Sequence, residues 1–276
     1  MEPDSIHFLS RINDRKRLEL LARAVEKIKD VPDDIALSEL QFVQVKVERD
    51  GKPYMDRAKI EKHLSELQYP LWFLDFETYG FAIPEYDGTR SYEQLPFQFS
   101  LHVQDSPGAA LRHVEFLHLE KSDPRRALAE ALVGAIGDGG TVITYHASFE
   151  RGRIEELAEA FPDLKPRLDA IAGRIFDLET PFAKKWFYDS RFQGSSSIKK
   201  VLPVLVPSMT YESMEIGKGD VAQMKYAEMI GLPSDSPERE KIRRDLLAYC
   251  GQDTLAMVKI LEVLQRIVVQ QAEPVA

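Results

Sequence analysis

One segment determines the architecture that we expect for this 276-residue chain, namely Leu71-Trp72-Phe73-Leu74-Asp75-Phe76-Glu77-Thr78. Its nearly continuous apolar run predicts a central β-strand that is covered on both faces. Because side chains alternate along a strand, Asp75 and Glu77 point to the same side, about 6 to 7 Å apart along the strand. Holding two anions close to a core is unfavourable unless something compensates, and a divalent cation does so efficiently. Alternatively, both carboxylates lie at a solvent-exposed strand end and only repel each other.

The residues from Tyr69 onward predict strands first and helices later. Two further antiparallel strands are expected at 97–103 and 112–119, then a helix at 125–136 and a strand at 141–145. Helices follow from about Phe149 and from Glu238 to about Val269. This order predicts an α/β protein with a mixed β-sheet flanked by α-helices, in the ribonuclease H-like arrangement.

The residues before Tyr69 predict a small, mainly helical N-terminal segment. Apolar residues recur at helical spacing before Val31-Pro32, and a second helix is expected to begin at Asp56. The first of these helices carries Leu18, Leu21, Ala22, Val25 and Ile28. Between the two helices, Phe42–Val47 is predicted to be a strand that enters an Asp50-Gly51 turn. We therefore expect a helical or connecting segment at 1–68 and a main domain at 69–276.

The composition limits the class of protein. A formal net charge of −9 excludes a broadly basic surface that coats nucleic acid. No apolar run approaches the roughly 18 residues that span a bilayer. The single cysteine, Cys250, and a start without a signal-peptide pattern predict the reducing cytoplasm. An acidic protein can still meet phosphates, because cations held between carboxylates supply the positive charge.

A further acid lies on the last predicted helix. Apolar residues follow a three-four spacing there, and Asp253 stands in the middle of this seam, one turn after Tyr249. A charged group on an apolar seam needs a buried arginine, a capping interaction or a metal. The alternative is a slightly rotated helix in which Asp253 reaches water.

The third motif is Tyr145-His146-Ala147-Ser148-Phe149-Glu150, which leads from the fourth strand into a helix. Ser148 is the expected N-cap, which leaves Glu150 in the first turn, where the helix dipole favours a negative charge. Ordinary helix capping also selects an acid at this position, so Glu150 alone does not indicate a metal site.

Together, the three motifs resemble the DEDD superfamily of 3'-to-5' exonucleases. Its acidic ligands come from an Asp-x-Glu strand, an acid that opens a later helix, and a helix with Tyr-x-x-x-Asp or His-x-x-x-x-Asp. The matching residues are Asp75, Glu77, Glu150, Tyr249 and Asp253. The tyrosine makes the chain similar to the DEDDy branch. Two departures are Glu150, where the superfamily usually has aspartate, and His146, where asparagine is common.

Four segments more closely resemble the bacterial family catalogued as domain of unknown function 2779, over Tyr69 to Leu264. They are Tyr69-Pro70-Leu71-Trp72-Phe73-Leu74-Asp75-Phe76-Glu77-Thr78, Pro96-Phe97-Gln98-Phe99-Ser100, Ser197-Ile198-Lys199-Lys200-Val201-Leu202-Pro203 and Tyr249-Cys250-Gly251-Gln252-Asp253-Thr254. In that family, the domain often follows a RecB-like nuclease domain. The resemblance therefore implies such a domain as a partner in a longer polypeptide, with residues 1 to about 68 as the connecting region.

The superfamily resemblance implies two-metal hydrolysis of phosphodiester bonds with two Mg²⁺ or Mn²⁺ ions. Asp75 is expected to bridge both ions, Glu77 and Asp253 to complete one site, and Glu150 to help hold the other. Tyr249 is expected to orient the attacking water, or to help deprotonate it. The implied substrate is the 3' end of single-stranded DNA or RNA, and no membrane partner is expected.

Four further residues are candidates for substrate binding: Thr78, His146, Lys199 and Lys200. Thr78 is expected at the terminal nucleotide, and the two lysines at the phosphate backbone. The alternatives are a packed, hydrogen-bonded His146 and a solvated helix start at the lysines. The alternative function is a catalytically weak or inactive nuclease-like domain that serves as a nucleic-acid-binding or assembly module. A third interpretation is an acidic scaffold that binds no divalent ion.

Overall fold

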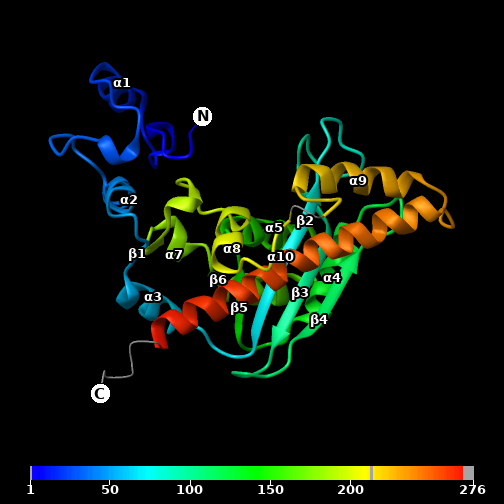
Figure 1. Cartoon of the computed structure of the whole chain (residues 1–276). Coiled ribbons are helices and arrows are strands. Elements are labelled where there is room, and N and C mark those ends of the chain that lie inside the picture. Colours follow the sequence, from blue (N-terminus) through cyan, green and yellow to red (C-terminus); the bar gives the residue numbers. More distant parts are fainter. Residues whose placement is uncertain (1, 212–213, 270–276) are drawn as a thin grey trace. The chain divides into compact units, whose positions relative to one another are not determined.

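The computed structural model describes residues 2–211 and 214–269 (Figure 1). The chain forms two compact units. The first comprises the chain up to Glu66, Glu179–Thr210 and the chain from Ile260, and the second comprises Leu67–Leu178 and Tyr211–Lys259. The first unit therefore contains more of the chain than residues 1–68. Within the described ranges, no helix combines the length and the apolar character that crossing a membrane requires.

The second unit is built on a five-stranded mixed sheet with the strand order β4-β3-β2-β5-β6. The strands are β2 (Leu71–Tyr79), β3 (Leu95–Gln104), β4 (Arg112–Leu117), β5 (Thr141–Thr144) and β6 (Ile175–Asp177). The central strand β2 pairs antiparallel with β3 and parallel with β5. The outer strands continue this pattern, β4 antiparallel to β3 and β6 parallel to β5. The predicted α/β class with a mixed sheet flanked by helices is confirmed.

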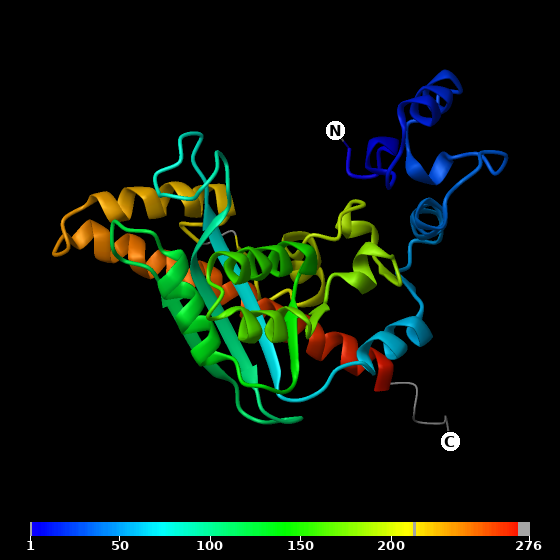
Figure 2. The ribbon, with the colours of Figure 1, turned by 180° about the vertical axis from the view of Figure 1, so that it is seen from behind.

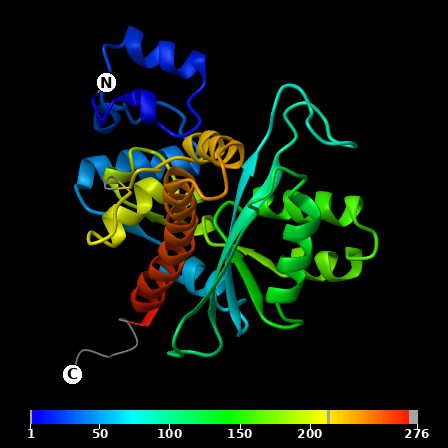
Figure 3. The same cartoon turned by 90° about the vertical axis from the view of Figure 1, so that its right-hand side faces the viewer.

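Helices cover both faces of this sheet (Figure 3). Three helices pack on one face, as the view from behind also shows (Figure 2): α4 (Arg125–Ala135), α5 (Ala147–Ala160) and α6 (Lys165–Ala172). Trp72, Leu74 and Phe76 of β2 belong to the core under these helices. Because side chains alternate along a strand, Asp75 and Glu77 face the opposite side. That side is covered by α10 (Pro237–Val269), and α9 (Gly219–Gly231) also packs against β2.

The first unit is mainly helical. Its α-helices are α1 (Asp14–Ala22), α2 (Glu39–Asp50), α3 (Arg57–Leu64), α7 (Thr180–Ala183) and α8 (Ile198–Leu205). Short 3-10 helices lie at Ile6–Phe8, Ile28–Asp30 and Ser190–Phe192, and β1 (Tyr54–Met55) pairs antiparallel with β7 (Phe187–Tyr188). A small apolar core that includes Ile6, Leu20 and Val31 holds its N-terminal part together.

The predicted strand Phe42–Val47 is wrong, because this segment lies inside α2. Ser38 and Gln41 form a capping box at the start of the helix, and Gly51, at φ 64°, closes its end in the left-handed conformation that glycine adopts readily. Valine at 43, 45 and 47 alternates as in a strand. However, Gln44 is buried together with its neighbours Val43 and Val45, which does not match the alternation of a strand with one exposed face.

The first predicted helix is shorter than its apolar spacing suggests. It ends at Ala22, and Ala24 has a φ of 56°, so the chain turns before Val25 and Ile28. Leu18 and Leu21 are 63% and 42% exposed, so they do not form the buried face. Leu20, between them, is the residue of this helix that enters the core.

Candidate metal centre

Three carboxylates from two elements meet on the face of the sheet that α10 covers. Asp75 and Glu77 come from β2 and Asp253 from α10, and one carboxylate oxygen of each lies within 4.8 Å of the others. Glu77 and Asp253 are each only 7% exposed. Hard oxygen donors in this number suit Mg²⁺ or Mn²⁺. The structure thus brings together Asp75, Glu77 and Asp253, and their roles as ligands stay predictions.

Electrostatic repulsion is strong in this cluster. Burial raises the pKa of Asp75 well above its ordinary value, and the nearby charges of Asp253, Glu77 and Glu150 raise it further. Opposing these effects, the buried Cys250 thiol lies 3.5 Å from Asp75 Oδ2 and donates to it. A bound divalent cation would reverse the repulsion, because its positive charge favours the ionised carboxylates.

Glu150 lies near the cluster, since its charge contributes to the raised pKa of Asp75. Because β2 and β5 run parallel, the chain leaves β5 at Thr144 level with the middle of β2, which carries Asp75, and then enters α5. Glu150 lies in the first turn of α5 and is 3% exposed. It is outside the group of three that meet within 4.8 Å.

The environment of Glu150 fits a cation better than it fits a solvated carboxylate. Burial raises its pKa to about 8, and the charges of Asp177 and Asp253 also raise it, against a backbone hydrogen bond that lowers it. Among the described residues, its buried Oε2 has no hydrogen-bond partner. A buried acceptor without a partner costs about 1–3 kcal/mol, which a coordinated ion would offset. Glu150 could therefore contribute to a metal site beside the three acids.

The start of α5 differs from the prediction, because Ser148 is not its N-cap. His146 occupies that position at φ 78°, so the helix begins at Ala147 and Ser148 lies inside it. The backbone N–H of His146 donates to Asp177 Oδ1 at 3.2 Å, across from the end of β6. Asp177 thereby helps to fix the start of the helix that carries Glu150.

Tyr249 and a second tyrosine, Tyr211, flank Asp253. Tyr249 is 3% exposed, and burial together with the charges of Asp253 and Glu77 raises its pKa above the ordinary value. Its phenol therefore stays protonated at neutral pH and can orient a water molecule rather than deprotonate one. The hydroxyl of Tyr211 donates to Asp253 Oδ1 at 2.5 Å.

Sequence reasoning missed Tyr211 and the contact of Cys250. Tyr211 lies between α8 and α9, outside any regular element and outside the four segments that carry the resemblance. Tyr211 and Asp253 are 42 residues apart in the sequence, so no local spacing predicts their contact. From the sequence, Cys250 is used only to predict a reducing cellular compartment. The signal for its contact is its position directly after Tyr249 on α10, close to the acids.

A polar layer of four side chains joins β3 to α10 beside the acids; we call it the Ser100–Thr254 layer, and its members are Ser100, His102, His113 and Thr254. Ser100 Oγ lies 2.7 Å from Thr254 Oγ1 and 2.8 Å from His113 Nε2, and His102 Nδ1 lies 2.8 Å from Thr254 Oγ1. Ser100 is the β3 partner of Asp75, and Thr254 follows Asp253. Two residues before Ser100 on the same strand, Gln98 Nε2 donates to the Leu246 carbonyl at 2.9 Å. These bonds tie α10, which carries Asp253, to β3, the antiparallel neighbour of the strand that carries Asp75 and Glu77.

The four candidate substrate contacts are spread over both units. Thr78 is 9% exposed and its hydroxyl donates to Gln94 Oε1 at 2.8 Å, whereas the side chain of His146 is exposed. Lys199 and Lys200 belong to the first unit, in the first turn of α8, where Lys200 Nζ donates to Gln193 Oε1 at 3.0 Å. The substrate roles of all four stay predictions.

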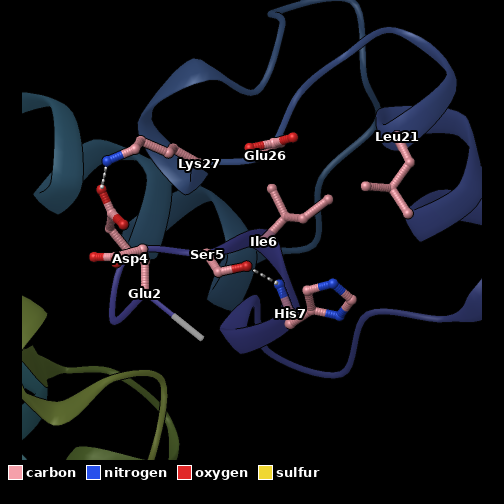
Figure 4. A pocket seen from close by; sticks show the side chains of 8 residues that line it. All are labelled: Glu2, Asp4, Ser5, Ile6, His7, Leu21, Glu26 and Lys27. Atoms are coloured by element: carbon pink, nitrogen blue, oxygen red, sulfur yellow. Dashed lines mark hydrogen bonds and ion pairs between the residues drawn. The ribbon is translucent and has the colours of Figure 1, made fainter.

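The first unit contains a pocket of about 300 Å³ that differs from the acid cluster (Figure 4). Its lining is Glu2, Asp4, Ser5, Ile6, His7, Leu21, Glu26 and Lys27. Lys27 Nζ pairs with Asp4 Oδ2 at 2.9 Å. The charge of this lysine is therefore matched within the pocket, and we assign no chemistry to it.

Comparison with known proteins identifies similarity without a known activity. Residues 72–197 match the model of a family described as "Domain of unknown function (DUF2779)". Two curated relatives are uncharacterized proteins of Mycoplasma: the MG366 homolog of M. pneumoniae, 28% identical over 207 residues, and MG366 of M. genitalium, 25% identical over 228 residues. The alignments cover 68% and 76% of this chain, and 31% and 34% of the relatives.

The chain thus spans about a third of the length of the curated relatives it matches. No solved structure matches it. The matched family supports the predicted resemblance to domain of unknown function 2779 over residues 72–197. That range contains Asp75, Glu77 and Glu150, while Asp253 lies beyond it.

Proposed function

We propose that this chain is a metal-dependent nuclease domain of the DEDDy type, which hydrolyses phosphodiester bonds from the 3' end of single-stranded DNA or RNA. The observation that carries the proposal is the meeting of Asp75, Glu77 and Asp253 within 4.8 Å. The ribonuclease H-like fold is part of the same proposal. Three antiparallel strands followed by two that run parallel to the central β2 support it.

The donor set fits hard divalent cations, Mg²⁺ or Mn²⁺. Asp75, Glu77 and Asp253 would hold one ion, and Asp75 and Glu150 would hold a second. When bound, two such ions supply positive charge to the attacking and leaving oxygens of an in-line displacement. The orphaned Oε2 of Glu150 is the observation that favours a second ion.

The side chains of the chain have distinct tasks in this mechanism. Asp75 and Glu77 are held on the central strand of the sheet, so their spacing is fixed by the backbone. The protonated Tyr249 hydroxyl orients the attacking water. Thr78 and His146 lie on the elements that carry Glu77 and Glu150, and they are the proposed contacts to the terminal nucleotide.

A second candidate function is nucleic-acid binding or assembly with weak or no turnover. The observation that favours it is the place of Glu150 outside the group of three acids. A domain that holds one ion tightly and the other poorly would bind a 3' end and cleave it slowly. Binding of oligonucleotides without Mn²⁺-dependent cleavage would support this function over the first.

The length of the relatives extends the proposal beyond this chain. We include a RecB-like nuclease domain elsewhere in a longer polypeptide, and a cytoplasmic location, as parts of the proposed function. Both are tested by activity and localisation of the longest natural polypeptide that contains this chain.

The deciding experiment is cleavage of 5'-labelled single-stranded DNA and RNA with Mn²⁺, against the Asp75→Ala and Asp253→Asn variants. We expect stepwise shortening from the 3' end in the wild type only, and no shortening of a circular substrate. In crystals soaked with Mn²⁺, two adjacent peaks about 3.5–4 Å apart are expected at the acids. Equal activity in the wild type and both variants would contradict the proposal.

A further inference from the structure

A hydrogen bond from Tyr211 ends on Asp253, one of the three acids of the cluster. It joins Tyr211 Oη to Asp253 Oδ1 at 2.5 Å, and Tyr211 is only 9% exposed. A hydrogen bond from a phenol to a carboxylate that is ionised, as a metal ligand must be, is shorter and stronger than a bond between neutral groups. Tyr211 thus holds Asp253 in place, although it is not itself one of the acidic residues of the cluster.

The surroundings restrict how the phenol of Tyr211 can move. Its ring meets the ring of Tyr249 edge-on, with 6.4 Å between centroids and an angle of 68°. Its carbonyl accepts a hydrogen bond from the Met214 backbone N–H at 3.1 Å. Tyr211 therefore approaches Asp253 from a fixed direction.

The first residue of α9 also lies close to the acids. A β-carbon built on Gly219, the first residue of α9, would lie 3.8 Å from Glu77 Oε2. Tyr211 thus contacts Asp253, and the start of α9 lies near Glu77.

We propose that Tyr211 is a positioning residue for the metal site: its hydroxyl fixes the orientation in which Asp253 offers its carboxylate to a divalent cation shared with Asp75 and Glu77. This inference rests on the proposed metal-dependent function. The side chain of Asp253 can rotate about its side-chain bonds, and a hydrogen bond to one of its two carboxylate oxygens restricts this rotation. Partners that orient a metal ligand typically contribute 10- to 100-fold in metal affinity or activity.

The test is the affinity for Mn²⁺ of the purified chain, measured by isothermal titration calorimetry on the wild type and on Tyr211→Phe. The substitution keeps the ring that meets Tyr249 and removes only the donor. We expect about 10-fold weaker binding of Mn²⁺ in the variant. The Mn²⁺ concentration that gives half-maximal cleavage should rise by the same factor, and saturating Mn²⁺ should restore most of the rate.

The matched control is Tyr226→Phe, in the same unit. Tyr226 is fully buried, stacks on Phe97 with 3.8 Å between ring centroids, and its hydroxyl has no hydrogen-bond partner among the described residues. Its variant should bind Mn²⁺ as the wild type does. The midpoint of thermal unfolding without metal, measured for both variants, separates a change of fold from a change of site.

The outcomes are distinct for the two proposals. If the wild type binds no Mn²⁺, the proposed function and this inference are both overturned. If the wild type binds Mn²⁺ and Tyr211→Phe binds it equally well or more tightly, only this inference is overturned. Lower thermal stability with unchanged Mn²⁺ affinity would show that Tyr211 packs without positioning Asp253.

Discussion

Two surface acids of the first unit and the acids around Asp75 in the second unit meet opposite environments. In the first unit, Asp4 pairs with Lys27 at 2.9 Å and Asp34 with Arg23 at 2.7 Å, and these basic partners lower the pKa of both carboxyls. In the second unit, burial and neighbouring acids raise the pKa of Asp75 and Glu150. The carboxylates of Asp4 and Asp34 thus hold surface ion pairs, while those of Asp75 and Glu150 are arranged against their own electrostatic preference. An arrangement of the second kind points to a ligand of positive charge.

The largest expected effect comes from removing a carboxylate of the cluster. Asp253→Asn should lower the cleavage rate by more than the roughly 10- to 100-fold that follows from losing a residue which only orients a ligand. It should also abolish stabilisation by Mn²⁺, which for the wild type amounts to about 2.7 kcal/mol at 100 times the dissociation constant. Cleavage assays and thermal unfolding with and without Mn²⁺ measure both. A variant that Mn²⁺ still stabilises fully would remove Asp253 from the site.

The second effect is a pH dependence of stability in the metal-free protein. Because the folded-state pKa of Glu150 is raised to about 8, its contribution is fully present below the ordinary glutamate pKa and is lost as pH rises toward 8. The free energy of unfolding should therefore fall with rising pH, by at most about 1.4 kcal/mol per unit from this group. Denaturant unfolding between pH 5 and pH 8 in a chelator should show a smaller decline for Glu150→Gln than for the wild type. Identical slopes would mean that Glu150 is solvated in the folded protein.

The smallest effect is expected at the surface pair of the first unit. The lowered pKa of Asp4 gives the opposite sign, since its contribution is present above the ordinary aspartate pKa and is lost as pH falls. Asp4→Asn should change the thermal midpoint little, and less still at high salt, because exposed ion pairs are screened. A large loss of stability in this variant would contradict the small contribution that we expect from an exposed ion pair.

Local spacing made much of the second unit predictable. The two-residue period of β2 placed Asp75 and Glu77 on one face, and the four-residue spacing of Tyr249 and Asp253 placed them on one face of α10. These relations depend only on the geometry of the element that carries them. The strands and the long helix were found where the apolar pattern predicted them.

Contacts between distant segments were not predictable in this way. The bond from Tyr211 to Asp253 depends on the path of an irregular connection, which no periodicity describes. In the first unit, the valines of α2 alternate over a short window, while the signals that identify a helix, Ser38 and Gly51, lie at its two ends. The strand prediction at 42–47 is wrong because it depends on the alternation of three valines and gives too little weight to the capping residues Ser38 and Gly51.

The bonds from β3 to α10 have a consequence for insertions and deletions in this chain. Gln98 holds the helix at Leu246, and Ser100 holds it at Thr254, so both sides of the Tyr249 turn are fixed against the sheet. One residue added between these two points would rotate Asp253 by about 100° and shift it by about 1.5 Å along the helix axis. Changes of chain length are therefore far less tolerable between 246 and 254 than in the connection between β2 and β3.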